Sequence, residues 1–420
     1  DYIRYENLLD SIRWDIGDFV DWVASDNPRT KYRNLITQAG GDTSDYPENA
    51  LETVFYPTNK IRLPVNKENV IESGIVNKED EDLIVDYIDI DLPESIITKN
   101  QILMLDILAN NDWKRPIYFT GGSYEDSEYI WMKDYLQLDG LVYKLVPIRT
   151  PIDRSNPYEM GRVDSGLMYD IVKKWSWGNS ESDEIYHDPE TRKNSISFRS
   201  NLSRLSEKLI SEGEYEKAEE ILDLAFSKMP IDYYGYYSLW TPLVKSYYDI
   251  GKSEKVKEIV QKLSFKYSDR LSYFSSLEIF NQYDVGEEII SDIERFRNLI
   301  ETIQESGERE ILADQIKSFI SSSEQFNYIY GEYDYYISLS NFLVSLLELN
   351  EVEYSMSVID KIEEQLIRRV SVFSNIDEDE QVYYLDGITS DINQYSMLIK
   401  QIEVYDIDDV SYTHLRAHDT

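Results

Sequence analysis

The sequence predicts an α+β protein that is mostly α overall, with a small mixed α/β domain followed by an α-helical solenoid. Two observations lead to this fold class. Strand-like and helix-like segments alternate between residues 51 and 150, and residues 196–405 repeat a pattern of paired amphipathic helices. The length of 420 residues and the hydrophobic content of 42% are sufficient for more than one core.

Residues 1–50 are predicted to form an N-terminal helix and a loop. Apolar residues recur at helical spacing through the first 26 positions, at Ile12, Ile16, Phe19, Val20 and Val23. Pro28 ends this helix, because the residue before a proline disfavours helical backbone. The chain begins without Met and inside this helical pattern, so we expect a fragment whose N-terminal portion is missing.

Residues 51–150 are predicted to form the small α/β domain. Three observations favour it: proline-bounded β-prone runs, "LIVDYIDIDL" with Ile88 and Ile90 on one face, and a helix with Thr98 as its N-cap and an apolar stripe at Ile102, Leu103, Leu105 and Leu108. The segment "EDSEYIWMKDYLQLDG" is predicted to be a further helix that Gly140 stops. The strands of this domain are expected in "TVFYP", "IRLPV", "LIVDYIDIDL", "PIYFTG" and "LVYKLVPI".

Residues 151–195 are polar and contain Pro and Gly, which predicts a connector. Residues 196–405 then match the tetratricopeptide pattern, with the first copy at Leu202, Leu205, Leu209, Gly213, Tyr215, Ala218, Leu222, Ala225 and Pro230. Small Ala218 and Ala225 would let two helices approach closely. A looser copy has its turn at Gly251, and a third has Asn350 there. The pattern predicts tetratricopeptide-like helical repeats.

The last ten residues, 411–420, differ abruptly in character and carry two of the three histidines of the chain. They are interpreted as a non-native tail and left out of the fold.

Composition excludes several classes of function. A net charge of −38 disfavours nucleic acid as a partner, because no basic stripe offsets the repulsion of a polyanion. The absence of cysteine excludes thiolate nucleophiles and Cys-ligated zinc. No nucleotide-binding glycine motif is present, so no cofactor is expected. No run of about 18 apolar residues occurs, so we expect no direct membrane insertion.

The stretch "ANNDWKRPIYFTGG" has two interpretations. Asn110 and Asn111 would end a helix and Pro116 would block its continuation before a strand, which is the structural interpretation we favour. The alternative is a contact with a ligand or partner through Trp113, Lys114, Arg115 and Tyr118.

Two further groups of residues are candidates for binding. The cluster Tyr233, Tyr234, Tyr236 and Tyr237 would form an aromatic platform for a sugar or peptide, or a packed helix turn. The carboxylates Asp86, Asp89 and Asp91 would be a solvated strand face or, as the weaker alternative, calcium ligands. With Asp139 they are also the residues that a carboxylate-based hydrolase or sugar-binding module would use.

Several segments resemble a family of bacterial multi-spanning membrane proteins whose N-terminal half looks like a protein O-mannosyltransferase-type glycosyltransferase. The matching segments fall between about residues 10 and 270, at "ASDNPRTK", "IRLPVNKENVIESGIV", "NNDWKRPIYFTGG", "YLQLDGLVYKLVPI", "WSWGNSESDEIYHDPETRKNSISFRSNLSRL" and "MPIDYYGYY".

The resemblance implies a domain set on the periplasmic face of the bacterial inner membrane, with its own N-terminal membrane domain as one partner. The catalytic residues of that family would lie in the membrane half, so none carries over to this chain. We therefore expect this region to position a secreted protein or glycan acceptor. The alternatives are a non-enzymatic tetratricopeptide-like scaffold and a carboxylate-based hydrolase or sugar-binding module.

Overall fold

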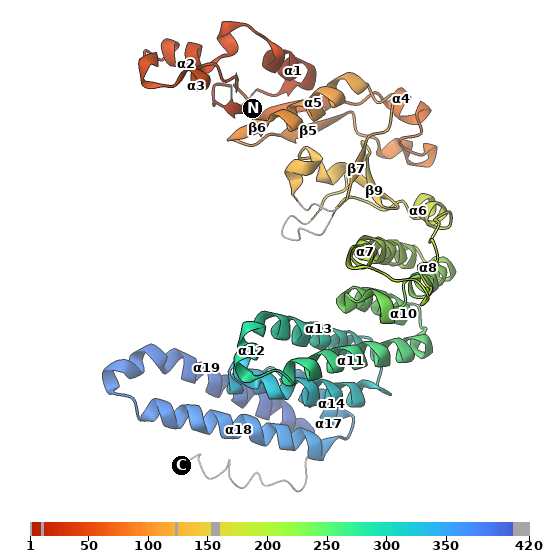
Figure 1. Ribbon diagram of the computed structural model, residues 1–420, viewed down its shortest axis with the longest axis vertical. Helices are drawn as coiled ribbons and strands as arrows, with labels where there is room; N and C mark the ends of the chain where they lie inside the picture. Colours follow the sequence, from red (N-terminus) through yellow and green to blue (C-terminus); the bar gives the residue numbers. More distant parts are fainter. Residues whose placement is uncertain (1, 10–11, 122–124, 153–159, 406–420) are drawn as a thin grey trace. The chain divides into compact units, whose positions relative to one another are not determined.

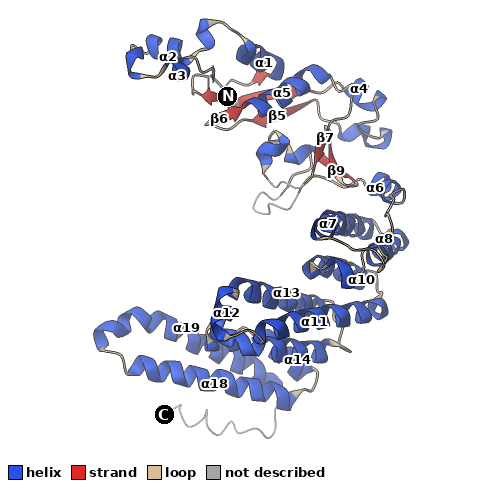
Figure 2. Cartoon of the chain, viewed as in Figure 1, coloured by secondary structure: helices blue, strands red, loops and turns tan. Residues whose placement is uncertain are grey.

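The computed structural model describes residues 2–9, 12–121, 125–152 and 160–405. Gly122, at the end of the candidate stretch, and the predicted tail 411–420 lie outside these residues. The chain divides into two compact units. Unit 1 comprises Asp1–Asn179 with Ser197–Glu212, and unit 2 comprises Ser180–Ile196 with Gly213–Thr420. In the described ranges helices predominate and strands occur in unit 1, which confirms the α+β class (Figure 2).

The described strands of unit 1 form three small sheets, ordered β3-β1-β6, β2-β4-β5 and β7-β9-β8. Their bounds are β1 Tyr2–Tyr5, β2 Trp14–Asp15, β3 Phe55–Tyr56, β4 Lys60–Pro64, β5 Tyr87–Asp91, β6 Ile96–Thr98, β7 Tyr118–Thr120, β8 Leu136–Asp139 and β9 Val142–Leu145. The antiparallel register of β4 and β5 sets Leu63 opposite Ile88 and Ile61 opposite Ile90, and all four are buried. The carboxylates of β5 therefore face away from the core, as the alternation predicted.

The helices of unit 1 include the predicted α5 and several short ones. Their bounds are α1 Ile16–Ala24, α2 Tyr32–Gln38, α3 Glu48–Leu51, α4 Lys67–Glu72, α5 Lys99–Asn111 and α6 Ser165–Val172. Thr98 caps α5 in a capping box with Gln101, which confirms the predicted start. Leu105 and Leu108 are buried as predicted, whereas Leu103 is exposed. Helices α1 and α5 pack together beside the sheets (Figure 1).

Two predicted helices in unit 1 are wrong. Residues 2–5 form strand β1, because they pair with β3 and β6, and the first helix begins only at Ile16. Residues 125–139 contain short 3-10 turns and strand β8 in place of a helix. Ile130 and Trp131 have φ of +52° and +57°, which interrupts helical backbone, and β8 pairs with β9. Tertiary pairing outweighs the local spacing in both cases.

Helix α7, Pro189–Ser211, contributes residues to both units and begins inside the segment expected to be a connector. The helices of unit 2 then follow in succession. Their bounds are α8 Tyr215–Lys228, α9 Ile231–Tyr234, α10 Thr241–Asp249, α11 Ser253–Ser275, α12 Ile279–Asp284, α13 Gly286–Glu305, α14 Leu312–Ser323, α15 Asn327–Tyr330, α16 Glu332–Ile337, α17 Ser340–Glu348, α18 Val352–Ser374 and α19 Glu378–Ile402.

The turn positions predicted from the repeat pattern all have left-handed backbone. The φ angles are +78° at Gly213, +72° at Gly251 and +65° at Asn350. Within unit 2, α10 packs on α8 and α11, α11 on α13 and α14, and α17 on α14 and α18. Each helix thus contacts its near neighbours, which is the packing of a helical array.

A line of aromatic rings joins four helices of this array, α11, α13, α14 and α17. Tyr267 of α11 stacks on Phe296 of α13 with ring centroids 5.4 Å apart. Phe296 meets Phe319 of α14 edge-on at 5.4 Å, and Phe319 meets Phe342 of α17 at 5.7 Å. All four side chains are buried, so part of the high aromatic content of the chain serves the core of unit 2.

Candidate functional site

Unit 1 contains an open cleft of about 810 Å³, a size that suits a small ligand. We call it the acid–aromatic cleft, because acidic and aromatic side chains dominate its lining. Its residues are Arg13, Val85, Asp86, Tyr87, Asp89, Asp91, Asp126, Trp131, Asp134, Tyr135 and Arg149. The cleft contains all three carboxylates that the sequence singled out in the segment "DYIDID", of which Asp89 and Asp91 lie on strand β5.

Strand β5 forms one wall of the cleft. The period of two along a strand places Tyr87, Asp89 and Asp91 on the same face. Arg62, opposite Asp89 on β4, donates from Nε and Nη2 to the two Asp89 oxygens at 2.7 and 3.0 Å. The same guanidinium lies 3.5 Å from the centre of the Tyr87 ring. Arg62 therefore orients both a carboxylate and an aromatic face of this wall.

Arg13 crosses the edge of the same sheet. Its Nη1 donates to the carbonyl oxygens of Ile61 and Ile90 at 2.9 and 3.3 Å, and its Nη2 donates to Asp91 Oδ1 at 3.0 Å. Its Nε also lies 3.5 Å from Asp89 Oδ1. These bonds fix the guanidinium at the base of the wall and tie it to both carboxylates.

The opposite wall comes from residues 126–135 and the loop after β9. Ile130 is fully buried, and Trp131 follows it with left-handed backbone. The buried Ile130 therefore fixes the position of the backbone from which the Trp131 indole extends. Asp134 is held by the backbone, since the Thr150 N–H donates to its carbonyl oxygen at 2.7 Å, and its carboxylate lies 3.6 Å from Arg149 Nε.

The hydroxyl of Tyr135 remains a proton donor at neutral pH. Burial raises its pKa, Arg149 opposes the rise, and the charges of Asp134 and Asp89 add to it. Asp89 belongs to the β5 wall and lines the same cleft as Tyr135, so the two walls face the same space. A ligand there would meet aromatic faces, a hydroxyl donor, guanidinium donors and carboxylate acceptors together.

The calcium alternative finds no support in this geometry. Asp86 lies at the rim, exposed and paired with Lys67 at 2.8 Å, while Asp89 and Asp91 bond to arginines. Within the described ranges, no group of three or more His, Cys, Asp or Glu residues is arranged to hold a metal ion.

The candidates in "ANNDWKRPIYFTGG" lie apart from the cleft. Trp113 is buried, and its indole N–H donates to the Pro64 carbonyl at 2.8 Å, so it packs as part of the core. Lys114 pairs with Asp112 at 3.1 Å, and Arg115 is exposed next to it. Tyr118 is an exposed residue of β7. The helix stop and strand entry are as predicted, and Arg115 and Trp113 line a small cavity of about 10 Å³ with mainly apolar neighbours.

Asp139 is a buried structural residue and does not line the cleft. Its Oδ2 lies 2.9 Å from Lys144 Nζ, with both side chains more than nine-tenths buried, and Gln137 Nε2 donates to its Oδ1 at 2.9 Å. The pair links neighbouring strands β8 and β9.

The tyrosine cluster of unit 2 is mainly packed. Tyr234 is buried and donates to the Ser180 carbonyl at 2.8 Å, and Tyr237 packs edge-on against Tyr267 at 5.8 Å. Tyr233 stacks on His187 at 6.0 Å beside a shallow hollow of about 420 Å³, whereas Tyr236 is exposed. The four tyrosines that were predicted to form one aromatic platform therefore lie in different surroundings.

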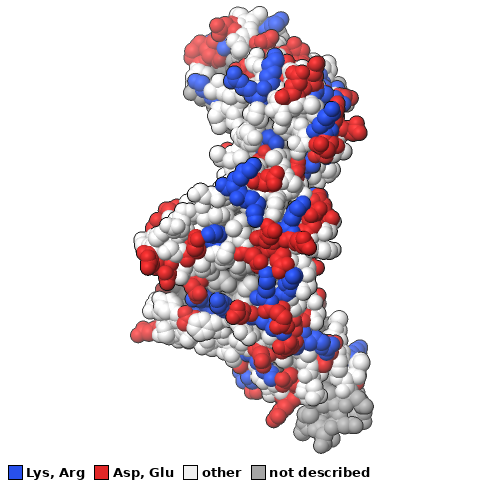
Figure 3. Space-filling view, turned by 90° about the vertical axis from the view of Figure 1, so that its right-hand side faces the viewer, with Lys and Arg blue, Asp and Glu red and all other residues white. Residues whose placement is uncertain are grey.

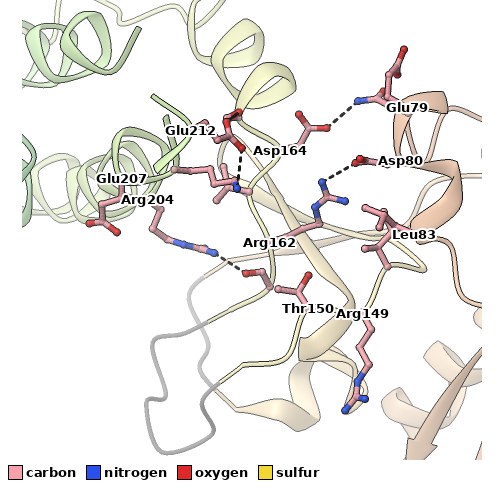
Figure 4. A pocket seen from close by; sticks show the side chains of 16 residues that line it. Glu79, Asp80, Leu83, Arg149, Thr150, Arg162, Asp164, Arg204, Glu207 and Glu212 are labelled. Carbon is pink, nitrogen blue, oxygen red and sulfur yellow. Dashed lines mark hydrogen bonds and ion pairs between the residues drawn. The ribbon is translucent and has the colours of Figure 1, made fainter. Parts of the chain in front are cut away.

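A second hollow of unit 1, about 880 Å³, is lined mostly by charged side chains that bind one another (Figure 4). Arg162 donates to Asp80 at 2.8 Å, Asn77 donates to Asp164 at 2.9 Å, and Lys208 pairs with Glu212 at 2.9 Å. Figure 4 shows Arg162 pointing toward Asp80 in this hollow. The first two bonds join separate segments of unit 1, whereas Lys208 and Glu212 lie four residues apart on one segment. We therefore assign this hollow a structural role.

The sequence missed half of the cleft. Trp131, Asp134 and Tyr135 were assigned to a helix, which would have placed them on different faces, and Arg13 was assigned to the first helix. The sequence feature that could have indicated this wall is the high density of aromatic and acidic residues in "SEYIWMKDYLQ". Helical spacing in the same segment obscured it.

These features define a two-unit chain with a ligand-sized cleft in an α+β unit and an array of helices after it. Residues 1–167, which contain every residue of the cleft, match the family model described as TMEM260-associated domain 2. TMEM260 is protein O-mannosyltransferase-like, so this part of the chain is similar to a glycosyltransferase-associated region. No curated protein and no solved structure matches the chain. Across the described residues, no helix combines the length and apolarity needed to span a bilayer.

Proposed function

We propose that this chain is the extracytoplasmic region of a membrane glycosyltransferase-like protein and that its acid–aromatic cleft positions an acceptor glycan or glycosylated peptide. The observation that carries the proposal is the cleft itself, with Tyr87, Trp131 and Tyr135 beside carboxylates and arginines. The match of residues 1–167 to a TMEM260-associated domain supports the link to glycosyl transfer. The catalytic residues are proposed to lie in a separate N-terminal membrane domain.

The lining suits a sugar for physical reasons. The faces of aromatic rings accept the apolar C–H faces of a pyranose, while fixed carboxylates and guanidinium groups bond its hydroxyls. The arginines also leave fewer free carboxylate lone pairs, so the cleft is less suited to a hard cation. A mixture of acids and bases covers the face of the molecule in Figure 3, with no separate basic face for a polyanion there.

Calorimetric titration of the chain with α-mannotriose and with an unglycosylated Ser/Thr-rich peptide tests the proposal. We expect saturable binding of the sugar and a loss of affinity of about tenfold or more in Trp131→Ala, since a stacking face is removed. Tyr118→Ala is the matched control, because Tyr118 is an exposed aromatic of the same unit outside the cleft. No sugar binding, or equal losses in the two variants, would refute the assignment.

A periplasmic location is part of the proposal and has its own test. The chain has no cysteine, and Tyr186 is highly exposed, so Tyr186→Cys in the full-length parent introduces a single accessible thiol in this region. Labelling of intact cells by a membrane-impermeant maleimide is expected if the region is extracytoplasmic. Labelling only after lysis would contradict the location.

Hydrolysis by the cleft carboxylates is the competing enzymatic function. Asp89 is bonded by Arg62 at both oxygens and approached by Arg13, so a substrate would have to compete with two arginines for this carboxylate. We therefore expect the bound oligosaccharide to be recovered intact after prolonged incubation. Release of reducing ends that Asp89→Asn abolishes would favour the hydrolase.

The helical array of unit 2 favours a scaffold function as a second candidate. Helices α10 to α18 pack on their sequence neighbours and form an extended surface of the kind that binds peptides. Peptide binding that persists in Trp131→Ala would assign acceptor recognition to the array.

A further inference from the structure

Strand β5 has an open backbone edge on the side away from β4. Among the described residues, the strand order places β5 at one edge of the sheet β2-β4-β5. The ladder with β4 uses the even-numbered residues, because the Leu92 N–H donates to the Asn59 carbonyl at 2.7 Å in the register of the two strands. Antiparallel ladders alternate, so the N–H and C=O groups of Tyr87, Asp89 and Asp91 point away from β4. Within the described ranges these outward groups have no backbone partner.

Backbone from the opposite wall reaches this edge only at its start. The Val85 N–H, two residues before Tyr87, donates to the Pro147 carbonyl at 3.0 Å. The chain then turns to the opposite wall, where the Thr150 N–H donates to the Asp134 carbonyl at 2.7 Å. The outward residues of β5 and Asp134 all line the acid–aromatic cleft. The open edge therefore borders the cleft.

The charge of the cleft limits what can pair with this edge. Five aspartates and two arginines line the cleft, so its lining is negative in balance. An antiparallel second copy of β5 centred on Asp89 would set this carboxylate opposite itself, and like charges directly opposite each other destabilise a strand pair. The edge is therefore protected against pairing with its own copy. A strand without acidic residues meets no such repulsion.

We propose that β5 binds an extended peptide segment of the acceptor, free of acidic residues, as an added strand along its open edge. The peptide backbone bonds the outward groups of Tyr87, Asp89 and Asp91 over about 13 Å of strand. The occupant is a peptide because a row of alternating backbone donors and acceptors is complemented by another extended backbone. This inference rests on the proposed function only in taking the occupant of the cleft to be the acceptor.

Residue-resolved amide hydrogen exchange tests the binding mode in the intact chain. The probe is a Ser/Thr-rich peptide that contains lysine and no acidic residue. At saturation we expect exchange to slow by about tenfold or more at Tyr87, Asp89 and Asp91. Exchange at Ile88 and Ile90 should change much less, since their N–H groups already face β4. No peptide binding, or binding without slowing at the outward amides, would overturn the proposal, and so would equal slowing at both sets.

α-Mannotriose provides a parallel arm that separates this inference from the proposed function. Sugar binding, together with a peptide that leaves the outward amides unchanged, would overturn the added strand and leave the glycan assignment in place. Slowing by the peptide without binding of the sugar would support the added strand and refute glycan recognition by the cleft.

Asp89→Pro and Asp89→Ala form a matched pair of variants. Both remove the carboxylate, but only proline removes the outward N–H, and edge strands tolerate proline where the N–H faces away from the sheet. Peptide affinity should fall about tenfold further in Asp89→Pro than in Asp89→Ala, because a backbone hydrogen bond is lost. Far-UV circular dichroism checks that both variants fold, and equal affinities of the two folded variants would overturn the proposal.

The charge of the peptide tests the choice of occupant. A peptide in which glutamates replace the lysines should bind the unchanged chain at least about tenfold more weakly at low salt, because its carboxylates meet those of the cleft. Equal binding of the two peptides would contradict an occupant free of acidic residues.

Discussion

Replacing Asp139 by Asn should strongly destabilise unit 1. The substitution keeps the size of the side chain and its capacity to accept from Gln137, but it removes the negative charge opposite Lys144. The ammonium of Lys144 is only 5% exposed and lies 2.9 Å from Asp139 Oδ2. It would remain in a low-dielectric strand pair without a counter-charge.

The expected loss follows from this geometry. Two unit charges 2.9 Å apart attract by about 6 kcal/mol at an effective dielectric constant of about 20. The cost of desolvating both groups offsets part of that attraction in the native pair. When Asp139 loses its charge, the cost of desolvating Lys144 remains, but the attraction that offset it is gone. Removing one partner of a buried ion pair typically lowers the free energy of unfolding by about 3–5 kcal/mol. We expect a decrease in the free energy of unfolding within that range.

Urea unfolding followed by tryptophan fluorescence measures the loss in the intact chain. Of the seven tryptophans only Trp240 lies in unit 2, so the signal reports mainly on unit 1. Asp91→Asn is the control, since Asp91 is 71% exposed and its ion pair with Arg13 should contribute less than about 1 kcal/mol. A loss below 1 kcal/mol in Asp139→Asn would refute the reasoning. So would a double variant with Lys144→Met that is no more stable than Asp139→Asn.

Three further predictions address the backbone, the helical array and the response to alkali. Gly161→Ala should lower the stability of unit 1 by more than about 2 kcal/mol in the same fluorescence assay, because φ is +59° and a Cβ would lie 2.1 Å from the Leu136 carbonyl oxygen. Ala218→Leu should cost about 1–3 kcal/mol in thermal unfolding followed by circular dichroism, because Ala218 is fully buried and a larger side chain would have to displace its neighbours. Burial, with a hydrogen bond to Glu324, raises the pKa of Tyr336 to about 12. An unfolded tyrosine ionises near pH 10, so this stabilisation is present below about pH 10 and is lost as the pH rises to about 12. Absorbance at 295 nm and circular dichroism should therefore change together in that window, and ionisation of all tyrosines near pH 10 without unfolding would contradict it.

The sequence predicted those elements whose local pattern and tertiary setting agree. Strand β5 alternates strictly, and its apolar residues meet a buried neighbour, so its two faces were correct. Helix α5 has both a capping box and a buried stripe. In the array, left-handed backbone at Gly213, Gly251 and Asn350 matches the expected turns, because few residue types tolerate that backbone.

The remaining elements depend on contacts that no local pattern encodes. The segment Tyr2–Tyr5 became a strand because β3 and β6 lie on either side of it. Trp131 has left-handed backbone at φ +57° although its side chain is large, and it follows Ile130, which is fully buried. The sequence therefore predicted only one wall of the cleft. The alternation of apolar and acidic residues along β5 indicated its carboxylates, whereas no local pattern indicated the aromatic residues opposite them.

The cleft follows from the way two sheets meet, and this has a consequence for ligand binding. One wall is β5 of the sheet β2-β4-β5, and Tyr135 immediately precedes β8 of the sheet β7-β9-β8. The Val85 N–H donates to the Pro147 carbonyl at 3.0 Å and joins the approach to β5 with the segment after β9.

The Asp139–Lys144 pair holds the second sheet without touching the cleft. Weakening the pair should therefore reduce the affinity for a ligand in proportion to the fraction of unit 1 that unfolds, with no change in the affinity of the folded fraction. Removal of Trp131 should do the reverse, because it changes the lining and leaves the pair intact. Titration and unfolding of both variants therefore separate residues that build the cleft from residues that contact its occupant.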